Sequence, residues 1–184
     1  MEAAWKYLLL NATGLLLAFL GTILYFTAVS ATGGAGDITW SGLVAQAGHL
    51  DPLIAKIAFI FVLVGYGTKV GLVPMHTWLP DAHSKAPPPI SALLSGVLLN
   101  VALITVIRLK GITDISIGSN DFTRHILVFL GLLSIVVATL IIFTQKNYKR
   151  LLAYSSIENM GIAALGIGLG GLGAMAALLH VIYH

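Results

Sequence analysis

The stretch IAFIFVLVGYGTKVGLVPMHTWLP, residues 57–80, places Lys69 behind twelve consecutive uncharged residues. Gly71, Pro74 and Pro80 follow within the same stretch. Proline removes a backbone donor and clashes with the preceding helical turn, so this pattern predicts an apolar helix that breaks just after the lysine. Broken helices in membranes are tolerated where protein or a water-filled cavity satisfies the freed groups, and ion carriers use them at binding sites. The pattern therefore favours an ion-handling site, with a simple structural kink as the alternative.

The composition of the whole chain indicates a membrane protein. Of its 184 residues, 58% are hydrophobic and 9% are charged, and the mean hydropathy is +0.95. Soluble domains carry about 25% charged residues, so too few charges remain here to cover a folded surface in water. The expected fold is all-α, a single polytopic transmembrane bundle over residues 1–184. At about 20 residues for each span, the length fits about six helices, one of them broken.

Six apolar segments are the expected helices. They cover residues 3–29, 52–72 with a broken continuation to 79, 90–109, 126–144, 151–165 and 171 onward. The expected connections are a flexible loop at 31–36, a short interfacial helix at 38–49, a polar loop at 111–121, a basic turn at 145–150 and a glycine-rich loop at 166–173. The basic turn favours the cytoplasm for its side of the membrane. The last helix spans about 21 Å, short of the ~30 Å hydrocarbon core, so we expect the protein to continue past His184.

Several classes of site are excluded or disfavoured. Cysteine is absent, which excludes a disulfide framework, an iron–sulfur cluster or a thiolate metal site within this chain. The net charge is +3, and without a basic stripe a nucleic-acid partner is not expected. Gly166, Gly168 and Gly171 match the GxGxxG pattern, but no strand precedes them, so close helix packing is the better interpretation than a nucleotide site. We expect no metal and no cofactor in this chain.

Lys69 is the strongest candidate for a functional residue. A lysine at that depth is costly to keep charged, and it usually faces the bundle interior, a partner or water. A neighbouring acid offsets this cost, so such a group can take and release a proton when its partner moves. The alternative is a lysine that extends its ammonium group to the interface, against which its central position in the helix argues.

Glu158, His180 and His184 are candidate proton-relay residues. Glu158 lies about eight residues into the expected helix at 151–165, and a structural hydrogen-bonding role is its alternative. His180 and His184 are four residues apart on a helix, so they share one face. Two histidines could hold a metal, but a further ligand is needed and none is nearby in the sequence, so a two-step relay is favoured over a metal site.

A polar cluster follows the expected helix break. It contains His76, Asp81, His83 and Lys85. These side chains are candidates for the point where protons reach the helix break from the aqueous side. An ordinary polar loop is the alternative that the sequence leaves open.

Four segments resemble one family of membrane proteins. They are EAAWKYLLL at 2–10, GYGTKVGLVPMHTWLPDAHSKAPPPISALLSGVLLN at 65–100, KRLLAYSSIENMGI at 149–162 and LLHVIYH at 178–184. They resemble the antiporter-like membrane subunits shared by respiratory complex I, multisubunit cation/proton antiporters and energy-converting hydrogenases. The residues in these segments are most similar to those of the hydrogenase-4 component F type, and the resemblance covers essentially the whole chain.

The resemblance implies a longer protein with two inverted repeats, each providing a half-channel for protons. This chain would span the end of the first repeat and the start of the second. Lys69 falls on the family's central lysine, and His180 and His184 fall on paired histidines that lead toward the second half-channel. Ser95 stands where complex I members often carry a histidine. Glu158 stands where those members usually have a small polar residue.

The implied function is proton translocation coupled to electron transfer elsewhere in a multisubunit complex. The chain would be a subunit without a redox centre, in the plasma membrane of a prokaryotic cell. Its partners would be lipid, other membrane subunits and a peripheral redox arm. Two alternatives remain open, a cation/proton antiporter subunit driven by an ion gradient and a membrane scaffold that does not pump.

Overall fold

The computed structural model describes residues 2–31 and 39–184, and every regular element in these ranges is helical. The α-helices are α1 Glu2–Ala31, α2 Trp40–Gln46, α3 Pro52–Val70, α4 Trp78–Lys85, α5 Pro88–Leu93, α6 Leu99–Ile117, α7 Asp121–Ile142, α8 Tyr148–Leu169 and α9 Gly171–Tyr183. Three short turns join them: the 3-10 turns η1 Ala47–His49 and η2 Met75–Thr77, and the π-helical turn η3 Leu94–Leu98. The all-α prediction is confirmed, and the predicted loop at 31–36 lies outside the described residues from 32 onward.

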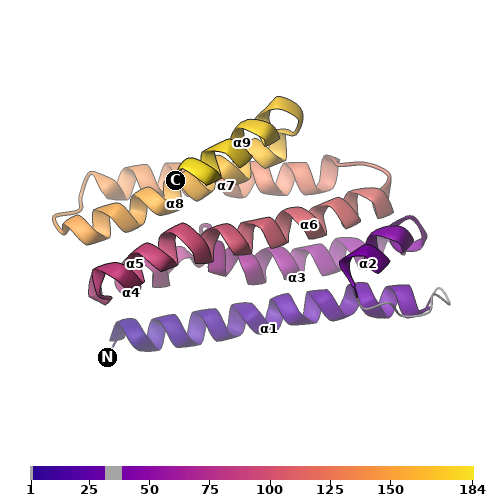
Figure 1. Ribbon diagram of the computed structural model, residues 1–184, viewed down its shortest axis with the longest axis horizontal. Coiled ribbons are helices and arrows are strands. Elements are labelled where there is room, and N and C mark those ends of the chain that lie inside the picture. The colour runs from indigo at the N-terminus through magenta and orange to yellow at the C-terminus, as the bar shows by residue number, and fades with distance from the viewer. Residues whose placement is uncertain (1, 32–38) are drawn as a thin grey trace.

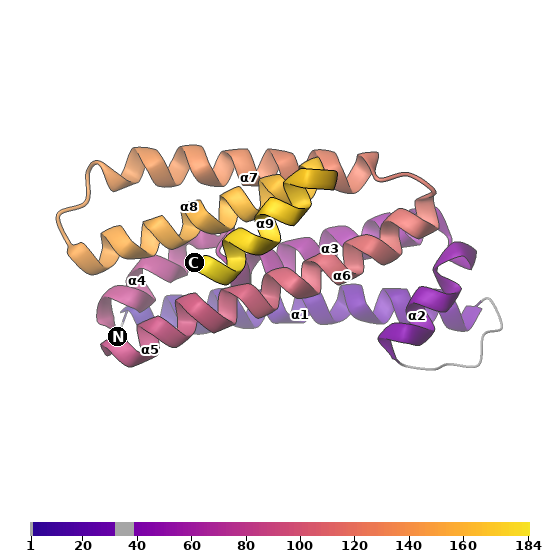
Figure 2. The ribbon, with the colours of Figure 1, turned by 45° about the horizontal axis from the view of Figure 1, so that its top comes forward.

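The long helices run side by side along the long axis of the molecule (Figures 1 and 2). The chain packs α1 along α3, α3 along α6, and α7 along α8. Helix α4 continues the direction of α3 after an irregular segment, and α9 folds back over α8. The N-terminus lies at the same end as α4 and α5.

Within the described residues, four helical stretches are long and apolar enough to cross a membrane. They are Glu2–Ser30, Pro52–Lys85, Pro88–Ile117 and Asp121–Ile142. Helix α8 has 22 residues, or about 33 Å, so its length also suits a crossing although it carries more polar residues. Helix α9 is apolar but shorter, with 13 residues. The structure therefore agrees with a transmembrane bundle of about six helices.

The polar loop predicted at 111–121 is confirmed only at residues 118–120, because α6 continues to Ile117 and α7 begins at Asp121. Its polar residues are paired within the protein: Lys110 forms an ion pair with Asp114 one turn along, and Thr113 Oγ1 lies 2.5 Å from the Tyr25 hydroxyl of α1. The helix ends at Gly118, whose φ of 71° suits a glycine cap.

The glycine-rich loop predicted at 166–173 is also mostly helix, since α8 runs to Leu169 and α9 begins at Gly171. The expected close packing is confirmed. A Cβ placed on Gly166 would lie 2.8 Å from the Gly173 carbonyl oxygen of α9, and one on Gly168 would lie 2.9 Å from Val128 of α7. These small residues let neighbouring helix backbones approach closely.

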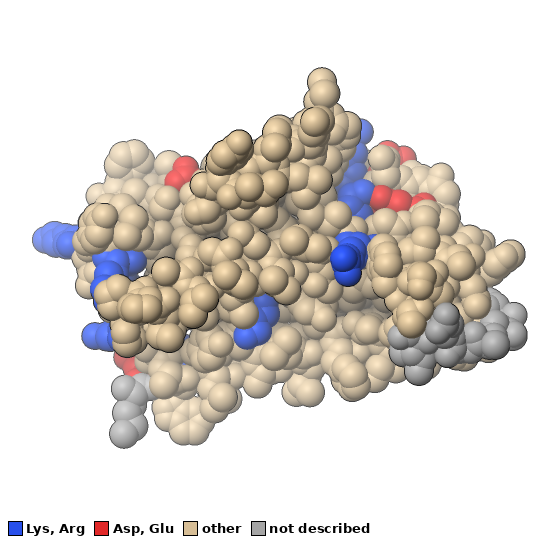
Figure 3. Space-filling view, viewed as in Figure 1, with Lys and Arg blue, Asp and Glu red and all other residues tan. Residues whose placement is uncertain are grey.

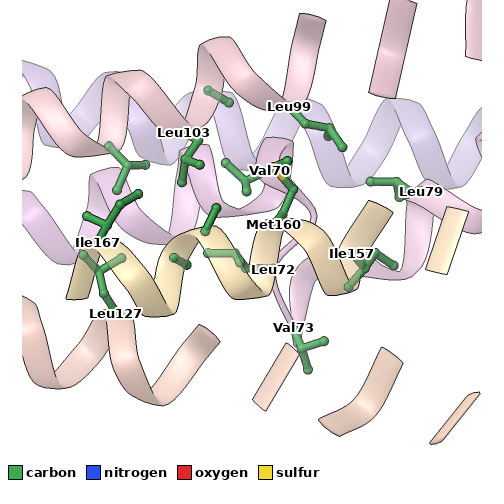
Figure 4. Packing of buried hydrophobic residues seen from close by; sticks show 14 of the residues in the cluster. Val70, Leu72, Val73, Leu79, Leu99, Leu103, Leu127, Ile157, Met160 and Ile167 are labelled. Carbon is green, nitrogen blue, oxygen red and sulfur yellow. The ribbon is translucent and has the colours of Figure 1, made fainter. Parts of the chain in front are cut away.

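The main core surrounds the irregular segment after α3. Figure 4 shows Leu72 and Val73 of this segment among side chains of α6, α7 and α8, including Leu103, Leu127 and Met160. All five side chains are buried. The first residues of the break are therefore enclosed by protein, which is the condition for irregular backbone at membrane depth, whereas Pro74 and Thr77 further along are exposed.

Candidate functional site

The helix break lies where the sequence predicts it. Helix α3 ends at Val70, and Gly71 follows with a φ of 81°, in the left-handed region. The N–H groups of Gly71 and Leu72 both donate to the Gly67 carbonyl oxygen at 2.9 Å. Pro74 then precedes η2. Pro80 does not break the chain further, because it lies in the first turn of α4, where proline is tolerated.

The backbone groups freed by the break find partners on other elements. The N–H of Val73 donates to Ser134 Oγ of α7 at 2.9 Å. The carbonyl oxygen of Thr68 accepts from Trp78 Nε1 of α4 at 2.7 Å. Ser134, Thr68 and Trp78 are all buried, so these bonds satisfy groups that would otherwise destabilise the fold.

Lys69 lies in the last turn of α3, directly before this break. Its side chain is half-buried, and its Nζ lies 5.3 Å from the centre of the Tyr7 ring of α1. Among the ion pairs of residues 2–31 and 39–184, none involves Lys69. The Lys69 amine is therefore next to the uncharged Tyr7 ring, close to the break between α3 and α4.

The two histidines after the break are buried in helical structure. His76 lies in η2 and is 9% exposed, and His83 lies in α4 and is 5% exposed. His76 Nδ1 and His83 Nε2 form no hydrogen bond with the described part of the chain. This region is therefore helical and not a loop, and its two imidazoles lie inside the protein.

Asp81 lies at the end of the molecule and joins three helices. Its carboxylate is 3.0 Å from Lys6 Nζ of α1 and 3.2 Å from Arg150 Nη2 of α8. Lys149 Nζ donates to the Ala86 carbonyl oxygen at 3.1 Å at the same end. Figure 3 shows basic side chains at this end of the molecule. It is the end where α4, α5 and the turn between α7 and α8 lie in Figure 1. The ion pairs give Asp81 a structural role in addition to any part in proton access.

The candidate relay residues lie on two sides of α8. The hydroxyl of Thr139 in α7 donates to Glu158 Oε1 at 3.2 Å. On the other side, His180 Nε2 of α9 lies 3.0 Å from Asn159 Oδ1. The rings of His180 and His184 stack with centroids 6.5 Å apart. The structure thus brings His180 to Asn159 and not to Glu158.

A cavity of about 540 Å³ adjoins His184 of this pair. Its lining includes His83, Ser91, Ser95, Ser155, Ser156, Asn159 and His184, from α4, α5, η3, α8 and the end of α9. Ser95 Oγ and Ser156 Oγ lie 2.9 Å apart in its wall. A water molecule takes about 30 Å³, so the cavity has room for several. Most of the lining surface is apolar, and the serine hydroxyl groups, which both donate and accept, belong to its polar part.

The sequence did not single out Tyr7, Ser156 or Asn159 as site residues. Ser156 and Asn159 carried a usable signal, because the run YSSIEN at 154–159 is unusually polar for an apolar helix. The partner of Ser156 lies in the π-helical turn η3, and such turns often occur at functional sites. Among the described residues, no three metal-ligating side chains gather into a group.

Comparison with known proteins gives consistent matches over the whole chain. Residues 1–184 match the family described as NADH:quinone oxidoreductase/Mrp antiporter, transmembrane. The chain is 45% identical over 190 residues to a hydrogenase-4 component F homolog of Methylacidiphilum infernorum (isolate V4), covering 100% of this chain and 39% of that protein. It is 35% identical over 187 residues to NAD(P)H-quinone oxidoreductase chain 4 of Gloeobacter violaceus, covering 100% of this chain and 34% of that protein.

Among solved structures, the chain is similar to one in the membrane-bound sulfane sulfur reductase, an archaeal respiratory membrane complex. The TM-score is 0.87 at 28% sequence identity, covering 100% of this chain and 36% of the other. The chain therefore spans between a third and two-fifths of the length of these proteins.

Proposed function

Because this chain belongs to the NADH:quinone oxidoreductase/Mrp antiporter transmembrane family, we propose that it forms part of a subunit that moves protons across a membrane. The family membership confirms the resemblance identified in the sequence motifs. The chain is a membrane protein, in agreement with its apolar helices. Its relatives are named for a hydrogenase and for quinone oxidoreductases. We propose that proton movement here is coupled to electron transfer in such a complex.

The observation that carries the proposal is the position of Lys69 directly before a helix break whose first residues, 71–73, are buried. The amine is half-buried at the end of α3, and the freed backbone next to it is held by Ser134 and Trp78. Ion carriers use broken helices of this kind at their binding sites. Lys69 is therefore the proposed proton carrier, and His76, Asp81 and His83 are its proposed connection to the aqueous side.

The polar residues of α8 and α9 support a second proton relay, separate from the one at Lys69. The Asn159–His180 bond and the stacked His180–His184 pair lie next to the cavity lined by Ser95 and Ser156. Imidazole groups exchange protons near neutral pH. Glu158 is proposed as a separate relay group, in contact with Thr139.

We also propose how this chain is organised and which partners it has in the complex. Residues 1–184 form one transmembrane domain that joins the end of one repeat to the start of the next. The redox cofactors lie on other subunits, and this chain contacts other membrane subunits, a peripheral redox arm and lipid. The matched family also includes Mrp antiporters, which favours a cation/proton antiporter as the second candidate function.

A double-mutant cycle on His180 and Asn159 tests the proposed relay. In the intact complex in sealed vesicles, we expect His180→Leu and Asn159→Leu each to slow proton translocation by about tenfold or more, because positioned acid–base groups contribute about 10²–10⁴-fold. The double variant should be no slower than the worse single one, since the two residues act as one unit. Proton movement is read with a pH-sensitive dye while electron transfer is recorded in parallel.

The control is Tyr183→Phe, which removes an exposed hydroxyl from the same helix. It should leave the proton flux unchanged. Full proton flux in both single variants would refute the relay.

A further inference from the structure

One face of α1 lies against Lys69 and the helix break. Tyr7, Asn11 and Gly14 are spaced four and three residues apart, so they share this face. A Cβ placed on Gly14 would lie 2.9 Å from Thr68 Cβ, and the Tyr7 ring lies 5.3 Å from Lys69 Nζ. Asn11 therefore lies between two points at which α1 contacts the end of α3.

The Tyr7 ring is held in a fixed orientation. It packs edge-on against Trp78, with ring centroids 5.3 Å apart at an angle of 69°. Trp78 is itself fixed, because it is fully buried and its Nε1 donates to the Thr68 carbonyl oxygen. The ring is therefore tied to the helix break, and its position beside the Lys69 amine is part of the packing.

Asn11 carries an acceptor that the fold does not use. The residue is 3% exposed, and its Nδ2 donates to the Tyr7 carbonyl oxygen at 2.9 Å. Its Oδ1 is buried and forms no hydrogen bond with the described part of the chain. A buried amide oxygen without a donor is unfavourable, and a protonated amine offers three donors.

We propose that Tyr7 and Asn11 form a neutral docking site on α1 for the protonated amine of Lys69. This rests on the proposed role of Lys69 as proton carrier. A ring face and an amide oxygen attract a cation without carrying a charge. When the amine loses its proton, this attraction falls away. The site thus holds the loaded carrier and releases the unloaded one, so Tyr7 and Asn11 are positioning residues.

Amine labelling of the intact complex tests the docking site independently of proton transport. A membrane-permeant acylating reagent reacts with the neutral amine, and mass spectrometry of the Lys69 peptide gives the rate. We expect Tyr7→Leu to raise the labelling rate of Lys69 by about two- to fivefold, the ratio that matches an ordinary cation–π contact. Tyr7→Phe keeps the ring face and should restore the wild-type rate. Lys56, which lies 5.6 Å from the Phe122 ring, is the internal reference and should not change.

Asn11→Asp is a second variant of nearly the same size that adds a charge. It should slow both the labelling of Lys69 and proton translocation, because a carboxylate holds the ammonium group more tightly. Unchanged labelling of Lys69 in both Tyr7→Leu and Asn11→Asp, with the complex assembled, would overturn the docking site. If labelling changes as expected but Lys69→Ala still moves protons, the docking site stands and the proposed carrier role fails.

Discussion

Replacing Lys69 with alanine is expected to stop proton translocation by the intact complex while electron transfer continues. The amine is the basic group in the last turn of α3, directly before the helix break, and loss of a positioned proton-transfer group costs about 10²–10⁴-fold in rate. Proton uptake into sealed vesicles and the rate of electron transfer, measured on the same preparation, give the ratio of protons to electrons. That ratio should fall to near zero.

Lys56→Ala is the matched control for this variant. Lys56 lies in the same helix and also faces an aromatic ring, that of Phe122, at 5.6 Å. It lies near the start of α3, far along the chain from the break, so its removal should leave the ratio unchanged. A normal proton-to-electron ratio in Lys69→Ala would favour a membrane scaffold that does not pump.

Gly65→Ala is expected to prevent the stable packing of α1 on α3. A Cβ at this position would lie 2.5 Å from the Gly14 carbonyl oxygen and 2.6 Å from Ala18 Cβ. These atoms belong to the backbone or sit directly on it, so the two helices must separate. Overpacking of this kind costs on the order of 3 kcal/mol. We expect little protein in the membrane and a much lower unfolding temperature in detergent.

Gly111→Ala is the control for the glycine substitution. Nothing lies within 4 Å of a Cβ placed on Gly111 in α6, and alanine favours a helix over glycine by about 1 kcal/mol. This variant should be as stable as the wild type or slightly more so. Equal unfolding temperatures for the Gly65 and Gly111 variants would contradict the close crossing of α1 and α3.

The sequence predicted the helix break because glycine and proline act on the backbone within a few residues. Gly71 and Pro74 end α3 wherever that helix packs, so no tertiary contact is needed to place the break. The loop prediction failed at residues 111–117, where the chain stays helical, for the opposite reason. Lys110, Asp114 and Thr113 look like loop residues in isolation, and they remain helical because their side chains are paired within the protein.

The candidate site was predicted only as separate residues. The contact between His180 and Asn159 depends on how α9 folds back on α8, which is set by the close approach of Gly166 and Gly173. The position of Tyr7 beside Lys69 depends in the same way on the crossing of α1 and α3. Such contacts join positions far apart in the chain, and a single sequence carries no local signal for them. The roles of Lys69, Glu158, His180 and His184 remain predictions.

The most direct test of proton translocation is a transport measurement on the intact complex in sodium-free vesicles. Electron transfer is started in the presence of a sodium ionophore, and the internal pH is followed with a dye. We predict proton uptake that persists without sodium and collapses when a protonophore is added. Electron transfer without any proton uptake, or uptake that appears only when a sodium gradient is supplied, would contradict the proposed function.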